Sequence, residues 1–235
     1  MKAIVLDRTP LAEQDLILTL LSESGEELRA VAKGARKPGG RLAARSELFS
    51  ESDLLLAKGR NLDIVSEASV IDAHPLLRGD LERVSAASTV CEAARLTCFA
   101  DAVDSFLYPI CSRALRACEE ASDQSHLDLV VAAYVLKVLA HAGWRPQFDS
   151  CVLCGDDDVT FLSVSSGGAL CSSCVKDVPD AEEVAPSTLA WLSALIRSTF
   201  DALLESEIDL LTSSTLVGSL AAKNIINLIL VLTIW

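Results

Sequence analysis

The chain has 235 residues, of which 51% are hydrophobic and 23% are charged, and this composition excludes disordered, collagen-like and low-complexity proteins. The 20 Lys and Arg residues against 33 Asp and Glu give a net charge of −13, which argues against attraction of the whole molecule to nucleic acid or to acidic membranes. No secretory signal pattern opens the sequence, so we expect a cytoplasmic protein in which clustered cysteines serve metal or redox chemistry.

Residues 1–75 have the pattern of a small β-barrel. Short apolar or alternating runs are separated by residues that favour turns, such as Thr9-Pro10 and Ser24-Gly25. The predicted strands are Ala3–Leu6, Leu16–Leu21, Leu28–Lys33, Leu54–Lys58 and Leu62–Val70. Five strands in this length favour the OB-fold, although an SH3-like barrel has the same pattern of strands and turns.

From residue 76 the apolar residues recur at helical spacing. The predicted helices are Leu81–Phe99, Val103–Glu119, Leu127–Ala142 and Thr188–Leu204. Residues 149–180, between the last two, are rich in Cys, Gly and Ser and form a small insertion. We therefore predict an α+β protein, with a five-stranded OB-fold barrel at residues 1–75 and a helical domain at residues 76–235 that carries the insertion.

The most apolar stretch of the chain is residues 225–235. It is too short to cross a membrane as a helix, which takes about 20 residues. We expect it to form a buried terminal element or a surface that contacts a partner, and we expect no association with membranes.

Four cysteines in the insertion have the spacing of a zinc site. They form two C-x2-C pairs separated by 16 residues, and the glycines beside them give the backbone the freedom that such pairs need. The four are Cys151, Cys154, Cys171 and Cys174. Together they supply four sulfurs for one structural, tetrahedral Zn²⁺ ion, with no open position for a catalytic water. Iron, a redox-active dithiol and loss of the metal are the alternatives.

The remaining cysteines form two pairs in which the partners lie seven residues apart: Cys91 with Cys98, and Cys111 with Cys118. On a helix, seven residues make two turns, or about 10 Å, so one metal ion cannot bridge either pair. We interpret these four residues as small buried hydrophobic side chains.

The cations are concentrated near the N-terminus. Residues 1–60 hold ten Lys and Arg against nine Asp and Glu, whereas residues 61–235 hold ten against 24. Residues 29–45 hold six cations and no carboxylate: Arg29, Lys33, Arg36, Lys37, Arg41 and Arg45. In the strand Leu28–Lys33, the cations alternate with small apolar residues and are expected to face outward.

This basic segment predicts DNA binding through phosphates, with an affinity that depends on salt and not on base sequence. Phe49 is the only aromatic residue before Phe99, so a base-stacking platform is missing and we expect weak, mainly electrostatic binding. The alternative is a solvated basic loop that balances nearby Glu residues. No G-x-S-x-G, Walker or G-x-G-x-x-G motif occurs, and we predict that the protein is not an enzyme.

Several segments of the chain resemble the RecO family of bacterial recombination mediators. The resemblance covers about residues 1–178 and follows the order barrel, helices, cysteine pairs, helix. The segments are Ala3–Arg8, Glu13–Glu23 with Gly25, Ala32-Lys33-Gly34-Ala35-Arg36, Ala142–Phe148, and the two C-x2-C pairs with Gly155 and Gly167–Leu170.

The resemblance implies an N-terminal OB-fold, a helical domain with a zinc motif, and non-enzymatic work in DNA repair and recombination. It further implies binding of single- and double-stranded DNA, annealing of complementary strands coated by single-strand-binding protein, and help to RecR in loading RecA. Lys33 and Arg36 match the barrel motif and are expected to contact DNA. The other four cations rest on the charge argument alone. Beyond about Leu216 the chain departs from the family's basic, amphipathic ending.

Two other functions fit parts of the sequence. One is a zinc-knuckle module whose acidic helical domain binds protein partners without DNA, and the other is a thiol redox enzyme that uses one C-x2-C pair. Oligonucleotide binding at two salt concentrations tests the first alternative. A thiol titration tests the second, because a zinc ion protects four thiols.

Overall fold

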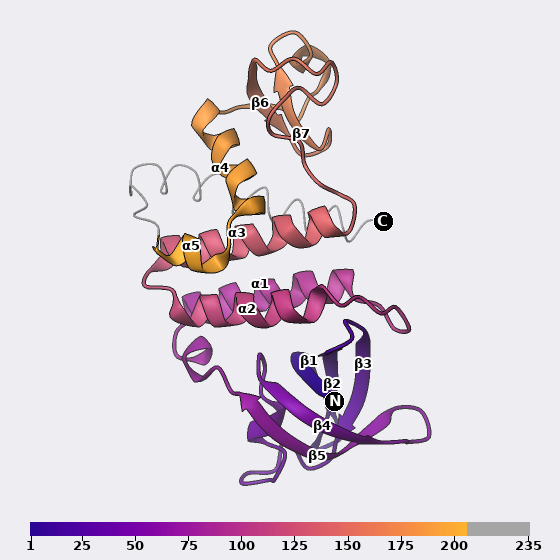
Figure 1. Ribbon diagram of the computed structural model, residues 1–235. Helices are drawn as coiled ribbons and strands as arrows, with labels where there is room; N and C mark the ends of the chain where they lie inside the picture. The colour runs from indigo at the N-terminus through magenta and orange to yellow at the C-terminus, as the bar shows by residue number, and fades with distance from the viewer. Residues whose placement is uncertain (206–235) are drawn as a thin grey trace. The chain divides into compact units, whose positions relative to one another are not determined.

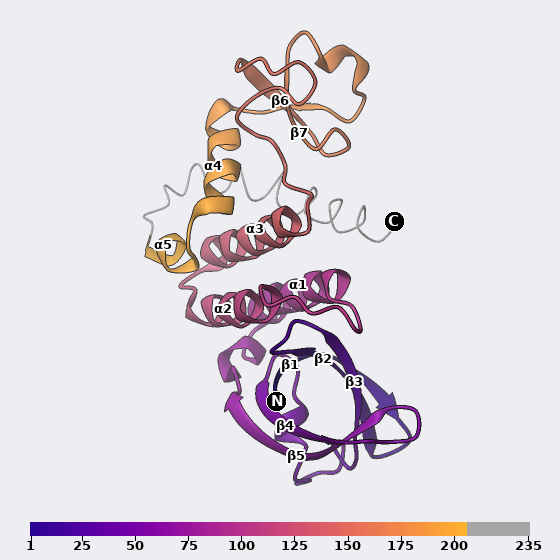
Figure 2. The same ribbon diagram turned by 45° about the vertical axis from the view of Figure 1, so that its right-hand side comes forward.

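Five strands close into a barrel at the start of the chain (Figure 1). They are β1 (Lys2–Leu11), β2 (Asp15–Ser22), β3 (Glu27–Ala32), β4 (Glu51–Ala57) and β5 (Asp63–Asp72). The order around the barrel is β1-β2-β3-β5-β4, in which β3 and β5 are parallel and the other neighbours are antiparallel. This is the Greek-key order of an OB-fold, so the fold prediction is confirmed. Figure 2, turned by 45°, looks into the barrel.

The barrel interior is filled by small and branched apolar side chains. In β3, Ala30 and Ala32 are buried in this core, whereas Arg29 and, just after the strand, Lys33 are exposed. The predicted facing of this strand is therefore confirmed. Because these cations project from the outer surface of the barrel, folding does not remove them from water.

The computed structural model describes residues 1–205 and divides the chain into two compact units. The first unit is Met1–Ala121, and the second begins at Ser122. The division into domains at residues 1–75 and 76–235 stays a prediction. The apolar stretch 225–235 lies outside the described residues. Among the helices of residues 1–205, none combines the length and apolarity that crossing a membrane requires.

Two helices complete the first unit. A short 3-10 turn, η2 (Pro75–Arg78), leads from the barrel into α1 (Leu81–Thr97), and α2 (Leu107–Glu120) follows. Asp80 caps α1, because its carboxylate accepts the Arg83 N–H at 2.8 Å.

The four cysteines of this helical region are buried: Cys91, Cys98, Cys111 and Cys118. Burial raises the pKa of Cys98 and of Cys118 to about 12. Thiols of this kind stay protonated and unreactive, so the interpretation of these residues as small core side chains is confirmed.

Helix α2 begins later than the predicted Val103, because the preceding segment is held by the barrel. Asp104 donates its backbone N–H to the Ser24 carbonyl at 2.8 Å, and its carboxylate accepts the Phe106 N–H at 3.0 Å. Gly25 lies against this segment in the left-handed region (φ +86°), where an added Cβ would be 1.8 Å from the Asp104 carbonyl oxygen. The β2–β3 turn and the start of α2 therefore pack with no room for a side chain.

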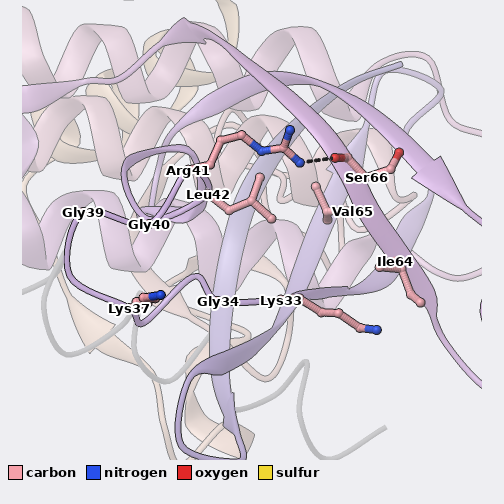
Figure 3. A pocket seen from close by; sticks show the side chains of 10 residues that line it. All are labelled: Lys33, Gly34, Lys37, Gly39, Gly40, Arg41, Leu42, Ile64, Val65 and Ser66. Atoms are coloured by element: carbon pink, nitrogen blue, oxygen red, sulfur yellow. Dashed lines mark hydrogen bonds between the residues drawn. The ribbon is translucent and has the colours of Figure 1, made fainter.

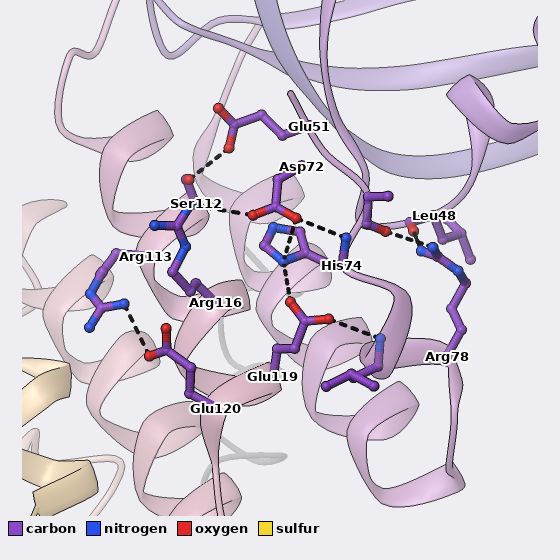
Figure 4. A network of polar contacts seen from close by, with 12 residues as sticks. Leu48, Glu51, Asp72, His74, Arg78, Ser112, Arg113, Arg116, Glu119 and Glu120 are labelled. Atoms are coloured by element: carbon purple, nitrogen blue, oxygen red, sulfur yellow. Dashed lines mark hydrogen bonds and ion pairs between the residues drawn. The ribbon is translucent and has the colours of Figure 1, made fainter. Parts of the chain in front are cut away.

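A buried histidine joins the end of β5 to α2 (Figure 4). The His74 side chain is 1% exposed, and its Nδ1 lies 2.9 Å from Glu119 Oε2 and 3.5 Å from Asp72 Oδ1. The second Glu119 oxygen accepts the Leu76 N–H at 2.9 Å, and the Arg116 guanidinium lies 3.3 Å from Asp72. The three side chains cluster as metal ligands do, but both carboxylates already have protein donors, and the cluster is explained as a structural link.

Replacing Glu119 by Ala is expected to lower the free energy of unfolding by about 1–3 kcal/mol, because the buried donor His74 Nδ1 loses its acceptor, and the more exposed Leu76 N–H loses its own. The neighbouring Glu120→Ala is the matched control. Within residues 1–205, Glu120 forms an exposed ion pair with Arg113 at 3.3 Å, and the loss of this pair is expected to cost at most about 0.5 kcal/mol. Urea unfolding followed by circular dichroism measures both, and equal destabilisation would show that the link is not structural.

The second unit is built around α3 (Gln124–His141), on which α4 (Pro186–Arg197) and α5 (Phe200–Glu205) pack. Asp123 caps α3 by accepting the His126 N–H at 3.0 Å. Most of α3 is apolar and buried, so it forms the core of this unit.

The predicted helix Thr188–Leu204 is two helices in the structure, so this boundary was wrong. Ser198 ends α4 in an extended conformation (ψ 148°). The Thr199 hydroxyl then accepts the Ala202 N–H at 3.2 Å and starts α5. Ser and Thr favour such caps over the helix interior, and the apolar pattern continued through the break without marking it.

The insertion and the residues just after it form a three-stranded sheet that the sequence did not predict. Its strands are β6 (Val159–Ser163), β7 (Gly168–Cys171) and β8 (Glu182–Glu183), in the order β7-β6-β8, with a 3-10 turn, η3 (Val175–Asp177), before the last. The sheet carries the second cysteine pair at the end of β7.

Candidate nucleic-acid interface and metal centre

The connection between β3 and β4 folds along the edge of β5. β3 pairs with β5 at only two positions, ending at Ile64. The loop of residues 33–46, which ends in the 3-10 turn η1 (Ala44–Ser46), follows β5 from there. The Arg41 guanidinium donates to the Ser66 carbonyl of β5 at 2.9 Å. The loop thus takes the place of β3 as the neighbour of β5.

Consecutive turns give the loop its tight path. The Gly34 N–H donates to Asp15 Oδ1 at 2.8 Å, the Lys37 N–H to the Gly34 carbonyl at 3.1 Å, and the Gly40 N–H to the Lys37 carbonyl at 2.8 Å. Gly34 and Gly39 have positive φ values of 68° and 69°, which favour glycine. A Cβ on Gly40 would lie 2.6 Å from the Gly34 carbonyl oxygen. The glycines in this segment are therefore required by its backbone.

A groove with a volume of about 490 Å³ opens between this loop and β5 (Figure 3). We call it the basic groove. Cations and loop glycines line its sides, and apolar side chains line its floor. The cations are Lys33, Lys37 and Arg41, and the apolar residues are Leu42, Ile64 and Val65.

Three of the six predicted DNA-binding residues are arginines held by backbone carbonyls. Arg36 donates to the Ala12 carbonyl at 3.2 Å, Arg41 donates to the Ser66 carbonyl, and Arg45 donates to the Arg41 carbonyl. A guanidinium has five N–H donors, so each keeps donors for a ligand. Their first effect is to fix the loop against β5 and the β1–β2 turn.

Half of the six predicted cations line the basic groove, and the other half, Arg29, Arg36 and Arg45, do not. Arg29, Lys33 and Lys37 are exposed, and no carboxylate within residues 1–205 forms an ion pair with any of them. Their charge is therefore available to an external anion. The structure places Lys33, Lys37 and Arg41 along the groove and leaves Arg29 on the outer face of β3.

The floor of the basic groove was missed in the sequence. Leu42 and Val65 are 5% and 4% exposed and belong to the barrel core, and Ile64 is half-buried beside them. Their residue types indicate only strands and core. The signal that separates them from other core residues is the early end of the β3–β5 pairing, which is a property of the topology.

The two cysteine pairs come together in the insertion of the second unit. The four sulfurs of Cys151, Cys154, Cys171 and Cys174 all lie within 4.8 Å of one another, and Cys154 Sγ lies 3.6 Å from Cys171 Sγ. None of the four forms a disulfide. Sulfurs bound to one tetrahedral zinc ion lie about 3.8 Å apart. The donor set and spacing therefore fit a Zn²⁺ site, and the predicted grouping of these residues is confirmed.

The surroundings of the sulfurs also fit a cation. Burial disfavours ionisation of Cys151, but the N–H groups of Cys171, Leu153 and Cys154 outweigh it and lower the pKa of Cys151 to about 6. Hydrogen bonds with the Cys154 and Cys171 sulfurs raise the pKa of Cys174 to about 12. Without a metal ion, the four sulfurs are held by hydrogen bonds from one thiol to another. A divalent metal ion would replace the protons of these hydrogen bonds.

Glycines close the backbone around the second cysteine pair. The Gln147 carbonyl accepts the Ala169 N–H at 2.7 Å, and the Gln147 N–H donates to the Gly167 carbonyl at 3.1 Å. Gly168 lies where the backbone of Gln147 passes against β7, and its φ is +157°. A Cβ on Gly168 would lie 2.1 Å from the Gln147 carbonyl oxygen. The segment that enters the insertion is thereby fixed to the strand that carries Cys171.

Replacing Gly168 by Ala is expected to destabilise the insertion by more than about 3 kcal/mol, because the methyl group overlaps a backbone carbonyl. Gly167→Ala is the matched control: it also has a positive φ, of 78°, but an added Cβ meets no atom within 4 Å. We expect a cost of about 1–2 kcal/mol there. The rate at which a chromogenic reagent reacts with the buried thiols of Cys151 and Cys171 measures local opening of the insertion. Equal rates in the two variants would contradict the argument.

Comparison with known proteins supports the same order of domains. A family model described as Recombination protein O N terminal matches residues 1–74, and one described as Recombination protein O C terminal matches residues 78–216. A DNA repair protein RecO from Bifidobacterium longum is 34% identical over 204 residues, which cover 86% of this chain and 84% of the relative. The corresponding proteins of Bifidobacterium animalis subsp. lactis and Nocardioides sp. are 38% identical over 199 residues and 37% identical over 206 residues. Each covers 83% of this chain, and the matches span 80% and 81% of those proteins.

Proposed function

The chain belongs to the RecO family of DNA repair proteins, and from this membership we propose that it binds single- and double-stranded DNA and anneals complementary strands coated by single-strand-binding protein. It makes and breaks no covalent bond in this work. We further propose that it assists RecR in loading RecA, so that RecA is an indirect partner. Its place of action is then the cytoplasm, on the nucleoid.

The observation that supports DNA binding is the basic groove on the outside of the barrel. Lys33 and Lys37 line it and are exposed, and no carboxylate of residues 1–205 pairs with either of them. We assign six DNA-binding residues: Arg29, Lys33, Arg36, Lys37, Arg41 and Arg45. The two lysines are the principal phosphate contacts of the basic groove. Neutralising phosphates on two strands lowers the repulsion that delays pairing, and pairing then releases about 1.4 kcal/mol per stacked step.

The surface charge confines this contact to a small part of the molecule. The whole chain carries a net charge of −13, so DNA is repelled by most of its surface and attracted by the loop. Weak, local attachment suits an annealing protein, because the protein must release the duplex that it has made.

We propose that the four clustered cysteines, Cys151, Cys154, Cys171 and Cys174, hold one structural Zn²⁺ ion. Four thiolates leave no position for a reacting water, so the ion would stabilise the insertion and take no part in chemistry. The sheet β7-β6-β8 is too small for a core of its own and would depend on the metal for its stability.

Filter binding of a single-stranded oligonucleotide at about 50 and 200 mM salt tests the proposal. Each phosphate contact on a single strand contributes about 0.7 to the slope of log affinity against log salt, so the affinity should fall about 20-fold for three contacts and about 300-fold for six. Annealing of coated complementary strands should be accelerated by the protein. Absence of oligonucleotide binding at both salt concentrations would instead support a zinc-knuckle module that binds only proteins.

A further inference from the structure

We infer that the basic groove is a subsite for a single nucleotide of an unpaired strand, with its phosphate between Lys33 and Lys37 and its base against the apolar floor. This inference rests on the proposed function and adds to it a preference among DNA forms. The groove would thereby bind single-stranded DNA more tightly than duplex DNA.

The size and the lining of the groove carry the inference. Its volume of about 490 Å³ is within the range of pockets that hold one small ligand. Its lining combines cations with the aliphatic residues Leu42, Ile64 and Val65, which form its floor; Ile64 is the half-buried member, and Leu42 and Val65 are 5% and 4% exposed. A nucleotide has the same division, because its phosphate is anionic and its base presents an apolar face. Figure 3 shows Lys37, Arg41 and Ile64 on different sides of the hollow.

A duplex can satisfy only the charged half of this site. Its bases are stacked inside the helix, and extruding one costs a few kcal/mol. An unpaired strand offers phosphate and base together. The apolar floor therefore favours single strands, whereas the lysines attract both forms.

Arg41 acts as a positioning residue in this subsite. Its guanidinium is bound to the Ser66 carbonyl at 2.9 Å, which holds the loop at a fixed distance from β5. The groove remains open because this bond and the Gly34–Lys37–Gly40 turns fix its wall. A lysine at position 41 could not make the same directed contact along the strand edge.

The absence of aromatic side chains from the groove lining sets the strength of binding. Its described lining consists of aliphatic residues, cations, glycines and Ser66. Aliphatic contact with a base is weaker than aromatic stacking and does not distinguish one base from another. The subsite is therefore weak and independent of sequence, which suits a protein that slides and releases.

Fluorescence anisotropy with a labelled oligothymidine of about 20 nucleotides and a duplex of the same length tests the subsite. Ile64→Trp fills the groove, and we expect it to weaken single-strand binding about fivefold while duplex affinity changes less than about twofold. Val70→Trp is the matched control, because Val70 lies on the same strand, is 39% exposed and does not line the groove. It should bind both forms as the unmodified protein does.

A second measurement needs no variant and is not affected by misfolding. The unmodified protein is titrated with a strand of the same length that consists of abasic residues. Loss of about fivefold in affinity relative to oligothymidine is expected, because the floor then has no base to contact. Equal affinity for the abasic strand, or an equal effect of Ile64→Trp on both DNA forms, would overturn the subsite. Failure of the unmodified protein to bind either form would overturn the proposed function itself.

Discussion

Exchange of both Lys33 and Lys37 for glutamate is expected to weaken single-stranded DNA binding by at least about 25-fold at 0.1 M salt. Each lost phosphate contact removes about 0.7 from the salt slope, and two lost contacts give this factor before the repulsion by the new carboxylates is added. The slope itself should fall by about 1.4. Both side chains are exposed, so the fold and the melting temperature should be unchanged. Anisotropy at several salt concentrations measures the affinity and the slope together.

The control for this variant carries the same change in net charge elsewhere. Arg145→Glu with Lys176→Glu reverses two exposed cations of the second unit. If the attraction is local, this pair should change the affinity by less than about threefold. An equal loss in both double variants would mean that the whole-molecule charge governs binding, and the basic groove would lose its role.

Removal of the metal ion is expected to have the largest effect on structure. Structural zinc sites contribute about 10–16 kcal/mol of binding free energy to the folded state, which exceeds what the small sheet of the insertion can supply. A strong chelator should therefore unfold residues 147–184 while the barrel of the first unit keeps its structure. Proteolysis should then cut within the insertion, and the remaining fragment should still bind DNA through the loop of residues 33–46.

Metal content and thiol reactivity provide the measurement. The purified protein should contain one zinc ion, and four of its eight cysteines should react with a thiol reagent only after chelation. Cys171→Ser should lose the ion. Cys98→Ser is the control, because Cys98 is buried in the first unit, whereas the four clustered cysteines belong to the second. Retention of the ion by Cys171→Ser, or an insertion that resists proteolysis without metal, would contradict a structural metal site.

The barrel and the cysteine cluster were predictable because their signals are local. Alternation in Leu28–Lys33 determines which side chains face the core, and the structure confirms it. The C-x2-C spacing determines that each pair of sulfurs points one way, so only their meeting had to be inferred. The pattern of strands and turns fitted both an OB-fold and an SH3-like barrel. The parallel pairing of β3 with β5 distinguishes them, and no local pattern encodes a pairing between distant strands.

The basic groove was only half predictable. Its cations form a run without carboxylates, which is visible in the sequence. The charge argument covers all six of them, and the resemblance to the RecO family singles out Lys33 and Arg36 as the expected contacts. In the structure Arg36 is directed to the Ala12 carbonyl, and Lys37 joins Lys33 in the groove. That difference arises from the turns of the loop, which depend on contacts with residues far away in the chain.

Helix boundaries failed for the same reason. Helix α2 was expected from Val103, but the bonds of Asp104 to the β2–β3 turn delay its start. Hydrophobic spacing does not detect these hydrogen bonds, because Asp104 lies between apolar residues, Val103 before it and Phe106 and Leu107 after it, which fit a helical pattern. The break between α4 and α5 comes from hydroxyl caps that also occur inside helices.

The short pairing between β3 and β5 has a second consequence for the molecule. A strand edge without a neighbour can recruit a strand from another copy and start aggregation, and natural barrels guard such edges with lysines and covering loops. Here the loop that covers the β5 edge and the lysines beside it are the residues that we assign to DNA. Selection for solubility and selection for DNA binding then act on the same few positions, and the tolerance of this segment to substitution is correspondingly narrow.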